Sequence, residues 1–200
     1  MQSIHRQIED KISSLKKGSI LFTVDFIDFG TAENVKKVLL RLEKKQILVR
    51  LAHGIYLYPK VDKELGILFP STEHIAEAIA KRDRIRIIPT GVFALQQLGI
   101  STQIPMNLVY LTDGAARKIK VGKRSITFKK TAPKNLAIKN RILSNIVQGL
   151  KELGLKNIDD SIREKIEQAL KKIPAETVKE EILNTSEWVR NEVLKIQNGK

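Results

Sequence analysis

The sequence predicts an α+β protein, and three stretches support this prediction. Residues 23–59 have the pattern of a short helix, a turn, a second helix and two β-strands. Residues 84–128 contain strand-like runs whose connections are too short for crossover helices, which favours antiparallel pairing. From about residue 135 onward the pattern is helical.

Length and composition limit the classes of protein that this chain can form. A length of 200 residues slightly favours two domains, and we place them at residues 1–70 and 71–200. The 42% of hydrophobic residues suffices for real cores, and the net charge of +14 favours polyanionic partners such as nucleic acid. Cysteine is absent, which excludes disulfides and thiolate metal sites.

The sequence gives no sign of membrane association. No stretch approaches the roughly 20 apolar residues needed to span a bilayer. The N-terminal segment carries Glu9 and Asp10 and has no apolar run of the kind found in secretory signals. We therefore expect a cytoplasmic protein.

The chain opens with a predicted amphipathic helix. Ile4, Ile8, Ile12 and Leu15 recur at helical spacing, and Gly18 follows as a stop signal. Residues 19–22 are expected to be extended and to join a small sheet. Thr23 is the predicted N-cap of a short helix that carries Val24, Phe26 and Ile27.

A second helix is expected directly after Gly30. Glycine can adopt the positive φ that ends the first helix, and the Thr31 side chain can accept a hydrogen bond at the start of the next one. The buried stripe of this helix is predicted to be Val35, Val38, Leu39 and Leu42. Its opposite face carries Glu33, Lys37, Arg41 and Lys44, with Asn34 and Lys36 on the flanks.

Two β-strands are predicted next, at residues 47–51 and 55–58, around a turn at residues 52–54 and before Pro59. This order of elements is that of a winged helix-turn-helix, which places its second helix in the DNA major groove. His53 lies in the turn, where it can contact phosphate or serve only as a turn residue. Basic helix faces are also commonly just solvated, and helix-turn-helix shapes also mediate protein contacts.

Residues 59–70 are predicted to connect the first domain to the second. Ser71 or Thr72 then caps a helix with one apolar face formed by Ile75, Ala76, Ile79 and Ala80. Residues 84–89 are predicted to form a strand whose basic residues alternate outward. Thr90 can cap a further helix that ends at Leu98, before Gly99.

Three more strands are predicted at residues 108–111, 117–121 and 125–128, with turns at Asp113-Gly114 and Gly122-Lys123. Residues 71–130 contain eleven Lys and Arg against four Asp and Glu, a net charge of +7. This charge indicates a second surface for a polyanion or an acidic partner. Alternatively, it keeps one sheet face wet and protects strand edges from aggregation.

Four amphipathic helices are predicted in the remainder. The first runs from Leu136 to Gly154, the second opens at Asp159 or Asp160 and ends before Pro174, and two shorter ones follow. The third carries Val178, Ile182 and Leu183, and the fourth carries Trp188, Val189, Val193 and Ile196.

No catalytic pattern is present, so we predict no catalytic residues, no metal site and no cofactor. The sequence lacks a P-loop, a dinucleotide glycine fingerprint and an HExxH motif. His5, His53 and His74 lie in three different predicted elements, which disfavours a shared metal. A metal-dependent nuclease needs clustered acids at strand ends, and the strands after Asp113 carry none. We therefore predict that the protein is not an enzyme.

Three motifs, RLAHGIYLYP, LGISTQIP and YLTDG, together with the helical tail, resemble the AbiEi-like antitoxins of type IV toxin-antitoxin systems over roughly residues 1–195. The resemblance implies a winged helix that represses its own operon at the promoter, and winged-helix repressors often bind inverted repeats as a homodimer. It also implies a C-terminal region that neutralises a cognate nucleotidyltransferase toxin. Carried over by motif, the DNA-binding residues are Thr31, Asn34, Lys37, Arg41, Arg50 and His53; the charged helix face adds Lys36 and Lys44.

Two alternatives stay open at this stage. The chain can be a basic protein-interaction module that meets an acidic partner and never binds DNA. It can also be a standalone winged-helix transcription factor with a ligand-sensing second domain, although no apolar pocket pattern is visible in the sequence.

Overall fold

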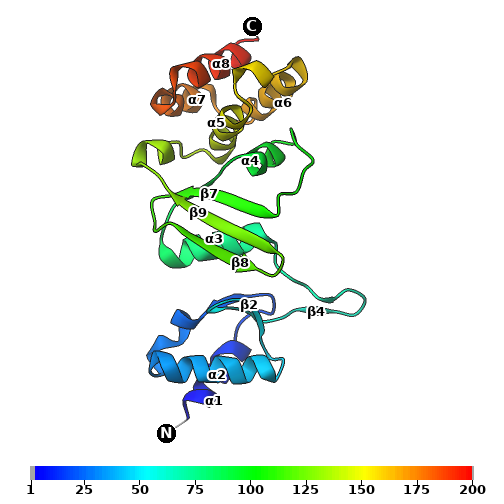
Figure 1. Ribbon diagram of the computed structural model, residues 1–200, viewed down its shortest axis with the longest axis vertical. Coiled ribbons are helices and arrows are strands. Elements are labelled where there is room, and N and C mark those ends of the chain that lie inside the picture. The colour runs from blue at the N-terminus through cyan, green and yellow to red at the C-terminus, as the bar shows by residue number, and fades with distance from the viewer. Residues whose placement is uncertain (1–2, 200) are drawn as a thin grey trace. The chain divides into compact units, whose positions relative to one another are not determined.

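The protein has the predicted α+β architecture, in a computed structural model that describes residues 3–199 (Figure 1). The chain divides into two compact units. The first holds the residues up to 78 together with 120–122, and the second holds residues 79–119 together with those from 123 onward.

The first unit consists of helices around a small sheet. Its sheet has the strand order β1-β3-β2 with antiparallel pairs, so the expected pairing of residues 19–22 with the hairpin is confirmed. The elements in chain order are α1 (Ile4–Ser13), β1 (Ile20–Phe22), the 3₁₀ helix η1 (Thr23–Phe29), α2 (Ala32–Lys44), β2 (Val49–Ala52) and β3 (Ile55–Leu57).

The short helix before α2 differs from the prediction in two ways. It is a 3₁₀ helix, and Thr23 is not its cap, because the carboxylate of Asp25 accepts the backbone N–H of Phe22 at 2.7 Å. Gly30 was expected to have a positive φ, but its φ of 162° and ψ of −172° are extended. A Cβ on Gly30 would lie 2.8 Å from Cδ1 of Ile4, so close packing against α1 favours glycine there.

A lysine of α1 holds η1 in place. The Lys11 ammonium donates to the carbonyl oxygen of Asp25 at 2.6 Å and lies 5.4 and 5.1 Å from the ring centroids of Phe26 and Phe29. Such cation–π contacts add to the hydrogen bond. A hydrophobic core of this unit is made of Ile8, Ile12, Leu21, Phe26, Val35, Val38, Leu39, Leu42, Leu48 and Tyr56.

Residues 59–70 form more than the predicted connection. They fold into a two-stranded antiparallel ribbon of β4 (Val61–Asp62) and β5 (Gly66–Ile67). The carboxylate of Asp62 accepts the backbone N–H groups of Glu64 and Leu65, and these two hydrogen bonds lower its pKa. The turn therefore depends on a local side chain, in a stretch that lacks the alternating pattern of a strand.

Helix α3 (Thr72–Asp83) follows, and Ser71 is its cap, with its hydroxyl accepting the N–H of His74 at 3.1 Å. The predicted strand at residues 84–89 is shorter than expected, because β6 spans only Ile87–Pro89. Arg84 has a φ of 54° and the N–H of Ile85 returns to the carbonyl of Ala80. Residues 84 and 85, which were predicted to begin the strand, therefore close the C-terminal end of α3 instead.

A four-stranded sheet of order β6-β7-β9-β8 lies in the second unit apart from residues 120 and 121 of β8. The expectation of mostly antiparallel pairing was wrong at its centre, because β7 and β9 pair in parallel along six residues. No crossover helix is needed, because the edge strand β8 returns the chain to the end of the sheet where β7 began. Strand β9 then lies between β7 and β8. The strands are β7 (Asn107–Thr112), β8 (Arg117–Val121) and β9 (Arg124–Lys130).

Helix α4 (Val92–Gln97) precedes this sheet region. Thr90 does not cap it, because Gly91 occupies the N-cap position and the Thr90 hydroxyl donates to the carbonyl of Val109 at 3.2 Å. The side chains of Phe93, Tyr110 and Phe128 pack together, with ring centroids 5.8 and 6.0 Å apart for the two successive pairs.

The C-terminal segment is helical as predicted and gathers around its own core (Figure 1). The first long helix begins at Arg141 and not at Leu136, because a 3₁₀ turn over residues 133–136 precedes it and Asn140 caps it. Asp159 is the cap of the second. The elements are η2 (Pro133–Leu136), α5 (Arg141–Leu153), η3 (Leu155–Asn157), α6 (Asp160–Leu170), α7 (Ala175–Glu181), η4 (Ile182–Asn184) and α8 (Glu187–Gln197).

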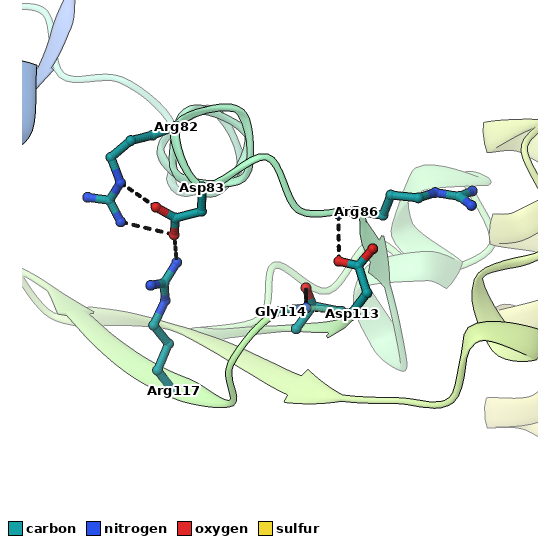
Figure 2. Close-up of polar contacts among 7 residues, drawn as sticks. Arg82, Asp83, Arg86, Asp113, Gly114 and Arg117 are labelled. Carbon is teal, nitrogen blue, oxygen red and sulfur yellow. Dashed lines mark hydrogen bonds and ion pairs between the residues drawn. The ribbon is translucent and has the colours of Figure 1, made fainter.

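An ion-pair cluster on Asp83 ties the end of α3 to β8 (Figure 2). Arg82 donates to both carboxylate oxygens at 2.6 and 3.0 Å, and Arg117 donates to one of them. The guanidinium of Arg117 also lies 5.3 Å from the ring centroid of Phe128. The hydrogen bond from Arg82, with a smaller contribution from Arg117, holds the pKa of Asp83 below its usual range.

The Asp83 cluster predicts an acid-dependent loss of stability. A carboxyl group whose pKa is lowered by folding stabilises the protein above its unfolded pKa of about 3.9 and loses this effect as the pH falls through the folded value. We expect Asp83→Asn to lower the free energy of unfolding at pH 7 by about 1–2 kcal/mol, with a smaller difference at pH 3. Urea unfolding at both pH values measures this. Asp160→Asn is the control, since that side chain is 99% exposed, and equal pH profiles for Asp83→Asn and the wild type would contradict the assignment.

Candidate nucleic-acid interface

Helix α2 has one buried and one exposed side. The predicted stripe of Val35, Val38, Leu39 and Leu42 is buried, which confirms that prediction. The eight residues predicted to bind DNA are all exposed: Thr31, Asn34, Lys36, Lys37, Arg41, Lys44, Arg50 and His53. The cationic face is therefore open to solvent and carries no packing role in the core.

Thr31 caps α2 as predicted. Its hydroxyl accepts the backbone N–H of Asn34 at 3.3 Å, and its φ of −62° and ψ of 149° are those of an extended N-cap residue. This hydrogen bond stabilises the first turn of α2, and it holds Asn34 at the N-terminal end of the helix.

Lys37 has a partner within α2. Its ammonium lies 2.7 Å from a carboxylate oxygen of Glu33, one turn earlier, and the side chains are 59% and 76% exposed. Ion pairs this exposed contribute little to stability and are screened by salt. A phosphate or a base edge can therefore replace Glu33 as the partner of Lys37 at small cost.

A small hollow lies between α2 and the β2–β3 hairpin. It has a volume of about 110 Å³ and brings together Lys36 and Leu40 of α2 with Arg50, His53 and Tyr56 of the hairpin. Burial raises the pKa of the Tyr56 phenol, although the charge of Arg50 opposes this. Three of the eight predicted residues thus meet in one cationic hollow, whereas the other five, Thr31, Asn34, Lys37, Arg41 and Lys44, do not line it.

Sequence reasoning missed one exposed residue of this surface. Leu40 is 41% exposed and lies one turn beyond Lys36 and Lys37, on the outer side of α2. The signal was present in the spacing, because Leu40 does not fall on the stripe that starts at Val35. Helical spacing therefore places Leu40 on the exposed face of α2, although its residue type is typical of a core.

The basic region of residues 71–130 is partly engaged in internal contacts. Arg82 and Arg117 bind Asp83, and the guanidinium of Arg86 donates to the carbonyl of Ile138 at 3.3 Å. Lys118 and Lys120 are exposed on the edge strand β8. Their place supports the interpretation that these lysines protect a strand edge.

The second unit also carries an open groove of about 700 Å³ among α4, α5 and α6. Leu98, Ile142 and Ala169 supply apolar lining, and charged side chains such as Glu164 and Lys172 flank them. Asn145 lines the same groove, is 5% exposed, and has a side-chain oxygen without a hydrogen-bond partner. The groove therefore combines apolar and polar lining and lies in the second unit.

Residues 3–199 hold neither a metal-binding cluster nor a membrane-spanning helix. No group of three or more His, Cys, Asp or Glu side chains in that range is arranged to hold a metal ion. No helix in the same range is long and apolar enough to cross a membrane.

Comparison with known proteins places the chain in a family without assigning an activity. A family model described as "Family of unknown function (DUF6088)" matches residues 7–178. No curated protein matches the sequence. Among solved structures, one described as "Crystal structure of RV2827C protein from Mycobacterium tuberculosis" aligns with a TM-score of 0.44 and 12% identity, over 97% of this chain and 78% of that one.

The cap at Thr31 can be separated from any DNA contact that this residue makes. Thr31→Ala removes the acceptor for the Asn34 N–H, so we expect the free energy of unfolding to fall by about 0.5–2 kcal/mol without DNA. Thr31→Ser keeps the acceptor and should retain most of the stability. Urea unfolding of both variants measures this difference, and an unchanged midpoint for Thr31→Ala would show that the cap contributes nothing.

Proposed function

The chain belongs to the DUF6088 family of unknown function. We propose that it is a DNA-binding antitoxin. In this proposal the first unit is a winged helix-turn-helix that represses the chain's own operon, and the second unit neutralises a cognate nucleotidyltransferase toxin. The observation that carries the DNA-binding part is the exposed cationic face of α2, fixed in orientation by the buried stripe on its other side.

The surface has the chemistry that a duplex requires. A helix of the width of α2 fits the major groove, and lysine and arginine neutralise phosphates while their long side chains reach base edges. Asn34, Lys37 and Arg41 are the proposed base-reading residues of α2. Lys36, Lys44, Arg50 and His53 are the proposed phosphate contacts, with Thr31 at the start of the helix.

The β2–β3 hairpin is the proposed wing. Its register shifts between Arg50 and Ala52, and Gly54 has a φ of 69° at the turn. Such a bulge bends a strand and re-aims its side chains. In the proposal this bend directs Arg50 and His53 toward the backbone beside the groove that α2 occupies, and two copies bind the two halves of an inverted repeat.

The groove among α4, α5 and α6 is the proposed contact surface for the toxin. Its apolar lining and the unpartnered oxygen of Asn145 supply both the hydrophobic and the hydrogen-bonding part of a protein interface. The same groove favours the second candidate function, a protein-interaction module without a DNA target. Binding of promoter DNA distinguishes the two.

Neutralising two cations of α2 tests the DNA-binding proposal. We expect Lys37→Ala together with Arg41→Ala to weaken binding to the DNA upstream of the chain's own gene, by about 1–3 kcal/mol for each side chain that reads a base. If either residue binds phosphate instead, the slope of log K against log salt should fall by about one for each phosphate that it neutralises. Fluorescence anisotropy across a salt series measures both quantities.

The matched control is Lys156→Ala together with Lys195→Ala, which removes the same charge from exposed positions of the second unit. This control should retain the wild-type affinity apart from a weak nonspecific effect. Equal affinities for the α2 variant and the wild type would remove this face from the proposal.

The toxin-neutralising part has a separate test in growth. We expect expression of the neighbouring gene alone to arrest growth and co-expression with this chain to restore it. The Lys37→Ala, Arg41→Ala variant should still rescue when both genes are transcribed from a foreign promoter, because neutralisation is assigned to the second unit. If expression of the neighbouring gene does not arrest growth, the antitoxin part of the proposal is wrong, while the repressor part is unaffected.

A further inference from the structure

We infer that α2 reads the C5-methyl group of thymine through Leu40, so that the bound DNA site contains thymine at the position facing this side chain. The inference rests on the proposed DNA binding and adds to it the kind of base that the helix selects. Its starting point is the exposure of a large apolar side chain in the middle of a cationic face.

The position of Leu40 places it among the residues that would meet DNA. It follows Lys36 by four residues and Lys37 by three, so all three lie on neighbouring turns of the same side of α2. Leu40 also lines the hollow that Lys36, Arg50 and His53 border. A partner that contacts these cations therefore also contacts Leu40.

The charges around Leu40 select the kind of partner. Lysines at positions 36, 37 and 44 and Arg41 are exposed on the same helix and outnumber Glu33, which pairs with Lys37. The same face of a second copy would therefore bring a net excess of like charges together. A polyanion gains from these charges. Duplex DNA is the partner that supplies phosphates at the rim and a groove floor at the centre, where Leu40 lies.

The chemistry of the groove floor then selects the base. In the major groove each base presents hydrogen-bond donors and acceptors, and thymine alone of the four standard bases adds an apolar methyl group. Leucine has no donor or acceptor, so it can form hydrogen bonds with none of the four bases, and the thymine methyl is the apolar group that it can contact. Contact with the thymine methyl buries apolar surface of the leucine against another apolar group.

Removal of the thymine methyl groups tests the inference directly. The DNA upstream of the chain's own gene is amplified with dTTP or with dUTP, which yields fragments of the same sequence with and without the C5-methyl. We expect the full-length wild-type chain to bind the uracil fragment about fourfold more weakly for each methyl contacted. Fluorescence anisotropy with both fragments measures the ratio.

Two variants complete the experiment as a double-mutant cycle. Leu40→Ala should bind the two fragments with nearly equal affinity, because it no longer reaches the methyl. Leu155→Ala removes a similarly exposed leucine from the second unit and should keep the wild-type ratio. Since Leu40 is exposed, neither its truncation nor the control is expected to disturb folding.

The outcomes separate the inference from the proposed function. Salt-dependent binding by the wild type with equal affinity for both fragments would overturn the thymine contact and leave DNA binding intact. A methyl preference that persists in Leu40→Ala would also overturn it, because the preference would then arise from DNA shape or from another residue. No binding to either fragment would overturn the proposed DNA binding itself.

Discussion

The burial of four apolar side chains on α2 is the constraint on which the candidate site depends. Val35, Val38, Leu39 and Leu42 pack into the core of the first unit and so fix the rotation of the helix about its axis. The opposite side must then face solvent, and it carries lysines, an arginine and Leu40. Close packing of Gly30 against Ile4 and the cap at Thr31 set where this helix begins.

Local patterns were sufficient to predict this helix, and they failed where another contact competed for the same residues or where a strand paired with a non-adjacent one. The buried stripe of α2 and the caps at Thr31 and Asp159 follow from spacing and residue type. The parallel pairing of β7 with β9 does not, because it depends on β9 inserting beside a strand that is distant in sequence. The strand expected at residue 84 failed because closure of α3 competed for the same residues.

The candidate site shows the same division. Exposure of the charged face of α2 could be predicted from helical spacing, whereas the hollow shared with the hairpin required the fold, since it joins Lys36 to Arg50 and His53. Leu40 was not part of the predicted buried stripe, and it was missed as a surface residue because the predicted DNA-binding face was chosen from polar and charged side chains alone. Conversely, part of the positive charge in the second unit stabilises the fold: Arg82 and Arg117 bind Asp83.

Hydrogen–deuterium exchange of the full chain, with and without the DNA upstream of its own gene, tests the central claim most directly. If the outer face of α2 and the adjoining hairpin bind the duplex, exchange should slow at the amides of residues 31–45 and 49–55 when DNA is added. Slowing confined to the helices of the second unit, with residues 31–55 unchanged in a DNA-bound sample, would contradict the account.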